Sequence, residues 1–177
     1  MKRAVFLDRD GVINHVIWQE NRPRAPMSLE EFELLPRSGE AIEMLRRAGF
    51  LTVVITNQPD VAAGVLQREV VEKINKQLRC LVPVDDIRVC YHRDQDGCGC
   101  RKPKPGMLLQ AAHTWSVALD RSFMVGDRWS DIGAGHAAGC TTILVGDGYG
   151  EDFPEAPHAV AESLFEASLL ILSEERV

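Results

Sequence analysis

Two pairs of acidic residues follow apolar segments that lie far apart in the sequence. Asp8 and Asp10 follow the first apolar run, and Asp127 and Asp131 follow another one far downstream. Acids that turn out of strand ends can share one crevice, where like charges need a cation, and Mg²⁺ takes carboxylate oxygens while leaving positions for a substrate phosphate. An Asp-x-Asp-Gly sequence by itself is equally compatible with a solvated turn. The acids therefore indicate a magnesium-dependent phosphate site only together with other features.

A second group of candidate ligands consists of Cys90, His92, Cys98 and Cys100. Three thiolates and an imidazole form a complete tetrahedral set for Zn²⁺ and leave no position for a substrate, so we expect a structural zinc. The segment is rich in Asp, Gly and Gln, and metal binding would supply the folding free energy that apolar packing cannot. The alternative is a cluster of thiols without metal.

Short apolar runs alternate with segments of helical periodicity, which predicts an α/β fold with a doubly wound, Rossmann-like parallel sheet. The expected strands cover residues 3–8, 51–56, 87–91, 122–126 and 141–145. Apolar stripes predict helices around 41–48, 70–81, 107–115 and 130–138, and a last helix from about 160 to 172. We expect residues 1–177 to form one domain, with the zinc loop at 90–100.

Polar residues gather where these strands are expected to end. Such sheets bind ligands beyond the carboxyl ends of the strands, at the point where the strand order reverses. Asp8 and Asp127 follow the first and fourth predicted strands, Thr56 ends the second, and Arg101 and Lys102 follow the loop after the third. Four separate strand ends thus indicate one common site.

Composition limits the class of partner. The chain has 177 residues, 45% of them hydrophobic, with a formal net charge of -6 and a pI near 5.4. The acidic balance argues against a nucleic-acid or anionic-membrane surface. The apolar run before Asp8 is too short for a signal peptide or a membrane span. We expect a cytoplasmic monomer that acts on a small molecule and binds neither nucleic acid nor membrane.

The motifs and their order resemble those of the haloacid dehalogenase superfamily of phosphohydrolases. The segments that look like its histidinol-phosphatase and heptose-bisphosphate-phosphatase branch are Asp8-Arg9-Asp10-Gly11, Thr56-Asn57-Gln58, the cysteine loop, Arg101-Lys102-Pro103-Lys104-Pro105-Gly106-Met107 and Gly126-Asp127. The resemblance covers about residues 3–145 and implies a Mg²⁺-dependent phosphomonoesterase without a separate cap domain, because 14–36 and 57–67 leave room only for loops.

The resemblance also implies a role for each catalytic residue. Asp8 would be the nucleophile that forms an aspartyl-phosphate, and Asp10 would act first as general acid and then as general base. Thr56 and Lys102 would donate to the phosphoryl oxygens. Mg²⁺ would be held by the Asp8 carboxylate, the main-chain carbonyl of Asp10 and Asp127.

The sequence determines the substrate less closely than the reaction. Pro105-Gly106-Met107 and Leu34-Leu35-Pro36 resemble the heptose-bisphosphate phosphatases, which implies removal of the C7 phosphate of D-glycero-D-manno-heptose 1,7-bisphosphate. Ala63 stands where an Arg is common, and Pro59-Asp60 replaces a usual Ser-Gly. Histidinol phosphate or another sugar phosphate therefore stays open. From another class, a non-catalytic, zinc-ordered phospholigand-binding module is the alternative, although all five catalytic positions are present.

Asn57, Arg101 and Arg9 are our candidates for substrate binding. Arg22, Arg24 and Arg9 could bind a second anionic group of the substrate, but for Arg22 and Arg24 a solvated loop is the favoured interpretation.

Two further residues have open roles. Lys104 competes with Lys102 as the catalytic lysine, although the family pattern favours Lys102. Asp131 is either a supporting acid of the site or the cap of the helix that begins there.

Overall fold

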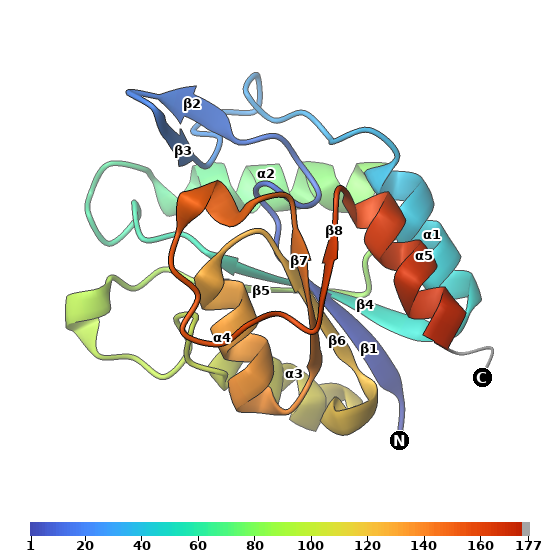
Figure 1. The fold of residues 1–177 in the computed structure, drawn as a ribbon. Coiled ribbons are helices and arrows are strands. Elements are labelled where there is room, and N and C mark those ends of the chain that lie inside the picture. The colour runs from blue at the N-terminus through green and yellow to red at the C-terminus, as the bar shows by residue number, and fades with distance from the viewer. Residues whose placement is uncertain (175–177) are drawn as a thin grey trace.

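A six-stranded parallel sheet runs through the centre of the molecule (Figure 1). The computed structural model describes residues 1–174, and the sheet consists of β1 (Arg3–Leu7), β4 (Phe50–Asn57), β5 (Asp86–Cys90), β6 (Phe123–Gly126), β7 (Thr141–Val145) and β8 (Ala159–Ala161). The order is β5-β4-β1-β6-β7-β8, and all neighbouring strands are parallel. After β1, the chain adds β4 and β5 on one side of this strand. It then crosses back and adds β6, β7 and β8 on the other side. The strand order therefore reverses between β1 and β6, which is where such sheets bind ligands.

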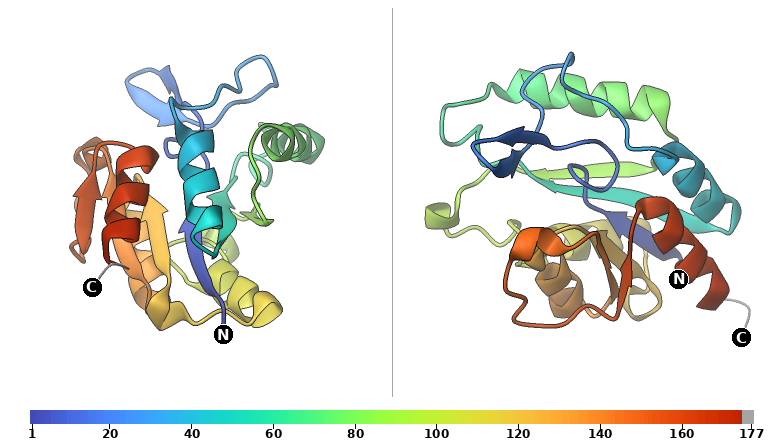
Figure 2. Two further views of the ribbon diagram at one scale, coloured as in Figure 1. Left: turned by 90° about the vertical axis from the view of Figure 1, so that its right-hand side faces the viewer. Right: turned by 45° about the horizontal axis from the view of Figure 1, so that its top comes forward.

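Helices cover both faces of the sheet (Figures 1 and 2). One face carries α1 (Ser38–Arg47), α2 (Arg68–Leu81) and α5 (Leu164–Glu174), and the other carries α3 (Gly106–Trp115) and α4 (Trp129–Ala138). Short 3-10 helices η1 (Asp94–Asp96), η2 (Leu119–Arg121) and η3 (Gly148–Gly150) lie in the connections. The predicted fold class is confirmed. Within residues 1–174, no helix combines the length and the apolar character that crossing a membrane requires.

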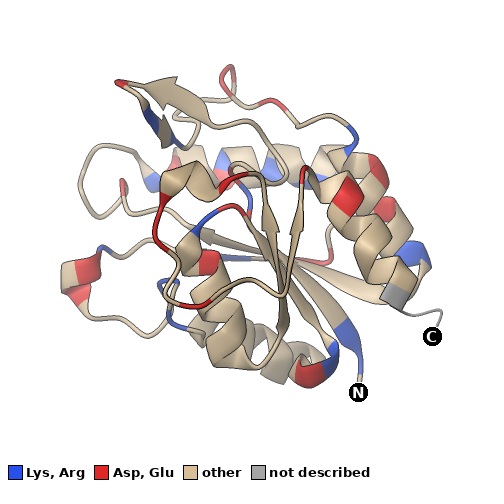
Figure 3. Cartoon of the chain, in the orientation of Figure 1, with Lys and Arg blue, Asp and Glu red and all other residues tan. Residues whose placement is uncertain are grey.

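Alternation of side chains along β1 divides the core into two clusters. Val5 and Leu7 pack with side chains of α1 and α2, whereas Ala4 and Phe6 pack with side chains of α3, and all four are fully buried. Burial on both faces is the reason that the strands read as nearly continuous apolar runs. β6 and β7 carry no charged residue, so charge at this part of the sheet is confined to the connections at the strand ends (Figure 3).

The five predicted strands are confirmed, with ends shifted by at most one residue. The last predicted helix is placed too early, because Val160 belongs to β8 and α5 begins at Leu164. The amide of Glu166 donates to the Ser163 hydroxyl at 3.2 Å, and the Glu166 carboxylate accepts from the amide of Glu162 at 2.5 Å. This Ser-x-x-Glu arrangement is a helix N-terminal signal that the periodicity argument passed over.

A β-hairpin occupies part of the segment where only a loop was expected. β2 (Ile17–Gln19) and β3 (Arg22–Arg24) are antiparallel, with Trp18 opposite Pro23. Glu20 and Asn21 connect them with φ values of 49° and 62°. Two successive residues at positive φ are typical of the type I′ turn that suits the twist of a two-residue hairpin. The hairpin projects away from the sheet rather than forming a cap domain (Figure 1).

Candidate functional site

A polar pocket of about 500 Å³ lies at the carboxyl ends of β1, β4 and β6. Its walls include seven residues singled out from the sequence: Asp8, Asp10, Thr56, Asn57, Arg101, Lys102 and Asp127. The hairpin borders it through Pro23 and Arg24, and the connection after β7 contributes Tyr149. The fold thus brings together the strand-end residues that are far apart in the sequence.

Three buried carboxylates form the floor of the pocket. Asp8, Asp127 and Asp131 each offer an oxygen, and these oxygens lie within 4.8 Å of one another. Burial, with the neighbouring acids, raises the pKa of Asp8 to about 7 and raises that of Asp127 as well. Oδ1 of Asp127 is buried and has no hydrogen-bond partner among the described residues. A divalent cation fits this set, because it would neutralise the carboxylates and occupy the unpaired oxygen.

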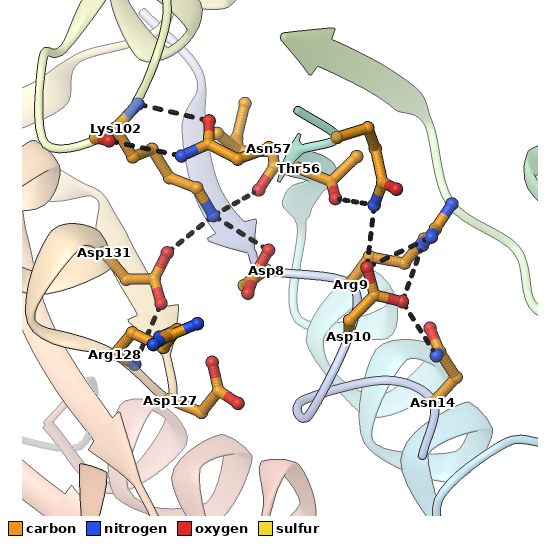
Figure 4. A network of polar contacts seen from close by, with 12 residues as sticks. Asp8, Arg9, Asp10, Asn14, Thr56, Asn57, Lys102, Asp127, Arg128 and Asp131 are labelled. Atoms are coloured by element: carbon orange, nitrogen blue, oxygen red, sulfur yellow. Dashed lines mark hydrogen bonds and ion pairs between the residues drawn. The ribbon is translucent and has the colours of Figure 1, made fainter. Parts of the chain in front are cut away.

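Lys102 supplies the positive charge in contact with this cluster (Figure 4). Its Nζ lies 2.8 Å from Oδ1 of Asp8 and 2.5 Å from Oδ1 of Asp131, and it donates to the carbonyl of Ile55 at 2.8 Å. Burial disfavours the ammonium, but the two carboxylates outweigh it and hold the pKa of Lys102 above its usual value. One ammonium against three carboxylates leaves the cluster acidic, which again favours a cation.

The side-chain amide of Asn57 fixes the main chain at Lys102. Its Oδ1 accepts from the Lys102 amide and its Nδ2 donates to the Lys102 carbonyl, both at 3.2 Å. Lys104, the rival candidate, is exposed and donates to the carbonyl of Cys98 at 2.7 Å. The structure therefore places Lys102 in the pocket and Lys104 outside it.

Asp10 is held by four hydrogen bonds. Its Oδ1 accepts from Arg9 Nε at 3.1 Å and from Asn14 Nδ2 at 3.0 Å, and its Oδ2 accepts from Arg9 Nη2 at 3.0 Å and from Gln58 Nε2 at 2.8 Å. Gln58 Nε2 also donates to the Thr56 hydroxyl at 2.9 Å. The Asp10 carboxylate is absent from the three-acid cluster, so a metal-binding role for Asp10 rests on its main-chain carbonyl alone.

The position of Arg9 contradicts its predicted role in substrate binding. Its side chain is fully buried behind Asp10, and Nη1 donates to Oδ1 of Asn75 in α2 at 2.8 Å. A guanidinium enclosed in this way cannot reach a ligand in the pocket. Arg9 instead orients the Asp10 carboxylate, a role that the sequence did not reveal because the partner Asn75 comes from a distant helix.

Asp131 combines the two roles that the sequence left open. Its Oδ2 accepts from the amide of Arg128 at 3.0 Å in a capping box at the start of α4, while its Oδ1 pairs with Lys102. The helix start is thereby tied to the catalytic lysine candidate. Gly126, just before it, must lack a side chain, because a Cβ there would lie 2.1 Å from Cβ of Asp131.

Tyr149 in η3 belongs to the pocket and was missed by sequence reasoning. Its hydroxyl donates to Oδ2 of Asp127 at 2.6 Å, and its ring meets that of Trp18 edge-on at 5.8 Å. Gly11 passes close by with φ 86°, and a Cβ there would lie 1.8 Å from Asp127 Oδ2. The glycine-rich segment around Tyr149 carries no motif, so no sequence signal pointed to it.

The basic residues at the rim differ in how much of their guanidinium is available. Arg24 is paired with Glu31 through two hydrogen bonds of 2.8 Å, which leaves little of it for a ligand. Arg22 is exposed on the hairpin, beside a neighbouring cavity. Arg101 donates from Nε to Asp94 at 2.7 Å, and its buried Nη1 has no partner among the described residues. Of these three, Arg101 is best placed to receive an anion.

The four residues predicted to bind zinc also lie close together. The donor atoms of Cys90, His92, Cys98 and Cys100 lie within 4.8 Å of one another. Sγ of Cys90 lies 3.2 Å from Sγ of Cys100 and 3.8 Å from Sγ of Cys98, and His92 Nδ1 lies 3.3 Å from Sγ of Cys100. A tetrahedron with Zn–S bonds of about 2.3 Å has edges of about 3.8 Å, so this donor set fits zinc.

Comparisons with known proteins identify relatives of this chain. The family model described as "HAD-hyrolase-like" matches residues 99–167. The D-glycero-beta-D-manno-heptose-1,7-bisphosphate 7-phosphatase of Pseudomonas putida is 38% identical over 154 residues, covering 84% of this chain and 85% of the relative. The enzyme of the same name from Pseudomonas aeruginosa is 40% identical and covers 84% of each chain.

A solved structure resembles the whole fold. It is that of the D,D-heptose 1,7-bisphosphate phosphatase from B. bronchiseptica complexed with magnesium and phosphate, which superposes with a TM-score of 0.84 at 34% identity and covers 97% of this chain and 99% of that one. A second, the D,D-heptose 1,7-bisphosphate phosphatase from Burkholderia thailandensis, has a TM-score of 0.69 at 27% identity.

Proposed function

The chain belongs to the family of the D-glycero-beta-D-manno-heptose-1,7-bisphosphate 7-phosphatases, and from this premise we propose that it removes the C7 phosphate of D-glycero-D-manno-heptose 1,7-bisphosphate. The observation that carries the proposal is the buried cluster of Asp8, Asp127 and Asp131 around Lys102 at the strand-order reversal. A phosphate ester that enters this pocket would meet the proposed nucleophile Asp8, the buried ammonium of Lys102 and several hydrogen-bond donors.

Magnesium is the metal that we propose for the acidic cluster. The Asp8 carboxylate, the unpaired oxygen of Asp127 and the main-chain carbonyl of Asp10 would hold it. When bound, Mg²⁺ offsets the repulsion between the Asp8 carboxylate and the phosphate dianion. This proposal agrees with the magnesium and phosphate in the B. bronchiseptica enzyme.

In the first step, a carboxylate oxygen of Asp8 attacks the C7 phosphorus and forms an acyl phosphate. The bond between phosphorus and the C7 oxygen of the sugar breaks, and Asp10 gives its proton to this leaving oxygen. The four hydrogen bonds from Arg9, Asn14 and Gln58 keep the Asp10 carboxyl in place for this transfer.

In the second step, a water molecule attacks the phosphorus of the acyl phosphate. Asp10 accepts a proton from this water, the bond between phosphorus and Asp8 breaks, and inorganic phosphate leaves. Both carboxyl groups then return to their starting state. Both acids therefore act in each step, with Asp8 making and breaking the covalent bond and Asp10 moving the proton.

The transferred phosphoryl group needs donors for its oxygens. The ammonium of Lys102 is held against the Asp8 carboxylate, where charge develops, and it would exchange its hydrogen bond to Asp8 for one to a phosphoryl oxygen when Asp8 attacks. Thr56, at the end of β4, adds a hydroxyl. Arg101 would bind the substrate through its unpaired Nη1, and Asn57 would contribute by holding the Lys102 main chain.

For the cluster of Cys90, His92, Cys98 and Cys100 we propose a structural Zn²⁺. The loop that carries it has little apolar surface of its own, and the last ligand is covalently joined to Arg101 and Lys102. Zinc would thus order the segment that delivers the catalytic ammonium. Reduced thiolates persist in a reducing compartment, which supports the proposed cytoplasmic location.

The experiment that tests the proposed function measures kcat/KM with and without Mg²⁺ on heptose 1,7-bisphosphate, histidinol phosphate and several sugar monophosphates. We expect a strong preference for the bisphosphate and, by ³¹P NMR, a product that retains the C1 phosphate. Asp8→Asn should abolish turnover. Release of phosphate from the monophosphates alone would contradict the proposed substrate but not the proposed mechanism. No release from any of these compounds would contradict both proposals.

A further inference from the structure

The two oxygens of the Asp127 carboxylate have different environments. Oδ2 accepts the hydrogen bond of 2.6 Å from the Tyr149 hydroxyl, whereas Oδ1 is buried and has no partner among the described residues. We propose that Tyr149 is a positioning residue for magnesium. By occupying Oδ2, it fixes the carboxylate so that Oδ1 is directed to the cation. This inference rests on the proposed magnesium site and adds to it a residue from outside the motifs.

Contacts with Asp147, Trp18 and Arg128 hold Tyr149 in place. Its main chain has φ 56° and ψ 24°, a left-handed conformation that is unfavourable for a residue with a side chain. The Asp147 carboxylate accepts from the Tyr149 amide at 3.0 Å and stabilises this turn. The phenol ring meets Trp18 of β2 edge-on and lies 5.9 Å from the Arg128 guanidinium. Backbone strain that is maintained by several contacts is typical of functional positions.

Space around the hydrogen bond is kept clear by Gly11. A Cβ at this position would lie 1.8 Å from Asp127 Oδ2 and 2.9 Å from the Tyr149 hydroxyl. The turn after β1 therefore lies so close to the Tyr149–Asp127 pair that a side chain at position 11 would clash with it. The catalytic turn, the metal-binding acid and the tyrosine form one packed unit.

A neutral donor suits this position better than a charged one. Lys102 already pairs with Asp8 and Asp131. A second positively charged side chain paired with Asp127 would compete with the metal for the negative charge of this carboxylate. The tyrosine hydroxyl orients the carboxylate without neutralising it. Groups that orient a metal ligand from behind in this way typically change metal affinity by about 10- to 100-fold when they are removed.

The test is Tyr149→Phe, which removes the hydroxyl and keeps the ring against Trp18. We expect the Kd for Mg²⁺, measured by isothermal titration calorimetry on the zinc-loaded protein without substrate, to rise about tenfold or more. In turnover assays, saturating Mg²⁺ should restore most of kcat and leave the substrate KM near its original value. A residue that only supports the fold would lower kcat at every Mg²⁺ concentration.

The matched control is Tyr91→Phe, which removes the hydroxyl of the other tyrosine of the chain and should leave the Kd for Mg²⁺ unchanged. A Kd for Tyr149→Phe within twofold of the original, in a protein where Asp127→Ala removes binding, would overturn the inference. Because Mg²⁺ binding is measured without substrate, the inference can hold even if heptose 1,7-bisphosphate proves not to be the substrate.

Discussion

Lys102 Nζ lies 2.8 Å from the carboxylate of Asp8, and both side chains are almost completely buried. The pair comes from two distant parts of the chain, the end of β1 and the segment after the cysteine loop. The ammonium is therefore a structural counter-charge for the acids, and we propose that it is also a donor for the transferred phosphoryl group. Removing it should affect stability and catalysis together.

The substitution Lys102→Met tests this double role. Loss of one partner of a buried ion pair costs about 3–5 kcal/mol. We therefore expect the free energy of unfolding, measured with urea in Mg²⁺-free buffer at pH 8, to decrease by this amount. Loss of the donor should lower kcat about 10²- to 10³-fold. Lys104→Met is the matched control, since Lys104 is exposed, and it should change the free energy of unfolding by less than about 0.5 kcal/mol. Equal effects of the two substitutions would contradict the assignment.

Arg9 supports Asp10 from inside the fold, and Arg9→Met should show this in the kinetic constants. The free energy of unfolding should fall by about 3 kcal/mol, because Asp10 and Asn75 both lose a buried partner. The value of kcat should fall while KM changes little, since Arg9 does not line the pocket. Arg22→Met on the exposed hairpin controls for the loss of one positive charge. A rise in KM with unchanged kcat would instead restore the predicted role of Arg9 in substrate binding.

Sequence reasoning predicted correctly which strand-end residues lie together in the pocket. Asp8, Thr56 and Asp127 each end or follow a strand that is recognisable by its apolar run, and in a parallel sheet these ends meet at one edge. Local spacing predicted the cysteine cluster, because all four candidate ligands lie close together in the sequence. Local pattern and sheet topology together were sufficient for these residues.

Sequence reasoning failed where a side chain reaches the site by tertiary packing alone. Tyr149 comes from a turn without a motif, and Asn75 from the middle of α2, where helical periodicity gives no reason to expect a buried polar contact. The inward direction of Arg9 could not be predicted for the same reason, because its partners come from other elements. The short hairpin around Trp18 was missed since three residues per strand are too few for a periodicity signal.

Zinc removal should act on catalysis from a distance. In Cys98→Ser/Cys100→Ser we expect loss of bound zinc, measured by mass spectrometry of the metal content, and faster amide hydrogen exchange over 90–102. Activity should decrease because the segment that carries Lys102 loses its anchor, although no zinc ligand lies in the pocket. Cys80→Ser is the matched control, because Cys80 is an exposed free cysteine away from the cluster. Unchanged zinc content in the double variant would refute the metal site.

The pKa of Asp8 leads to a prediction about pH and stability. Burial raises this pKa from 3.8 to about 7 in the metal-free protein. Between about pH 4 and pH 7 the folded protein therefore keeps a proton that the unfolded chain releases. The free energy of unfolding must then decrease as pH rises through this window, by about 1.4 kcal/mol for each unit of difference in pKa. Below pH 4 the carboxyl is protonated in both states, and this contribution to stability is fully present.

Urea unfolding from pH 4 to pH 8, in buffer without Mg²⁺ that leaves the zinc in place, measures this dependence. The original protein should lose more stability than Asp8→Asn over the same range, because the amide does not titrate. Addition of Mg²⁺ at pH 8 should restore stability in the original protein by preferential binding to the folded state, and much less so in the variant that lacks the Asp8 carboxylate. Parallel pH curves for the two proteins would show that Asp8 ionises in the folded state as it does in the unfolded chain, and would remove the electrostatic argument for a cation at this cluster.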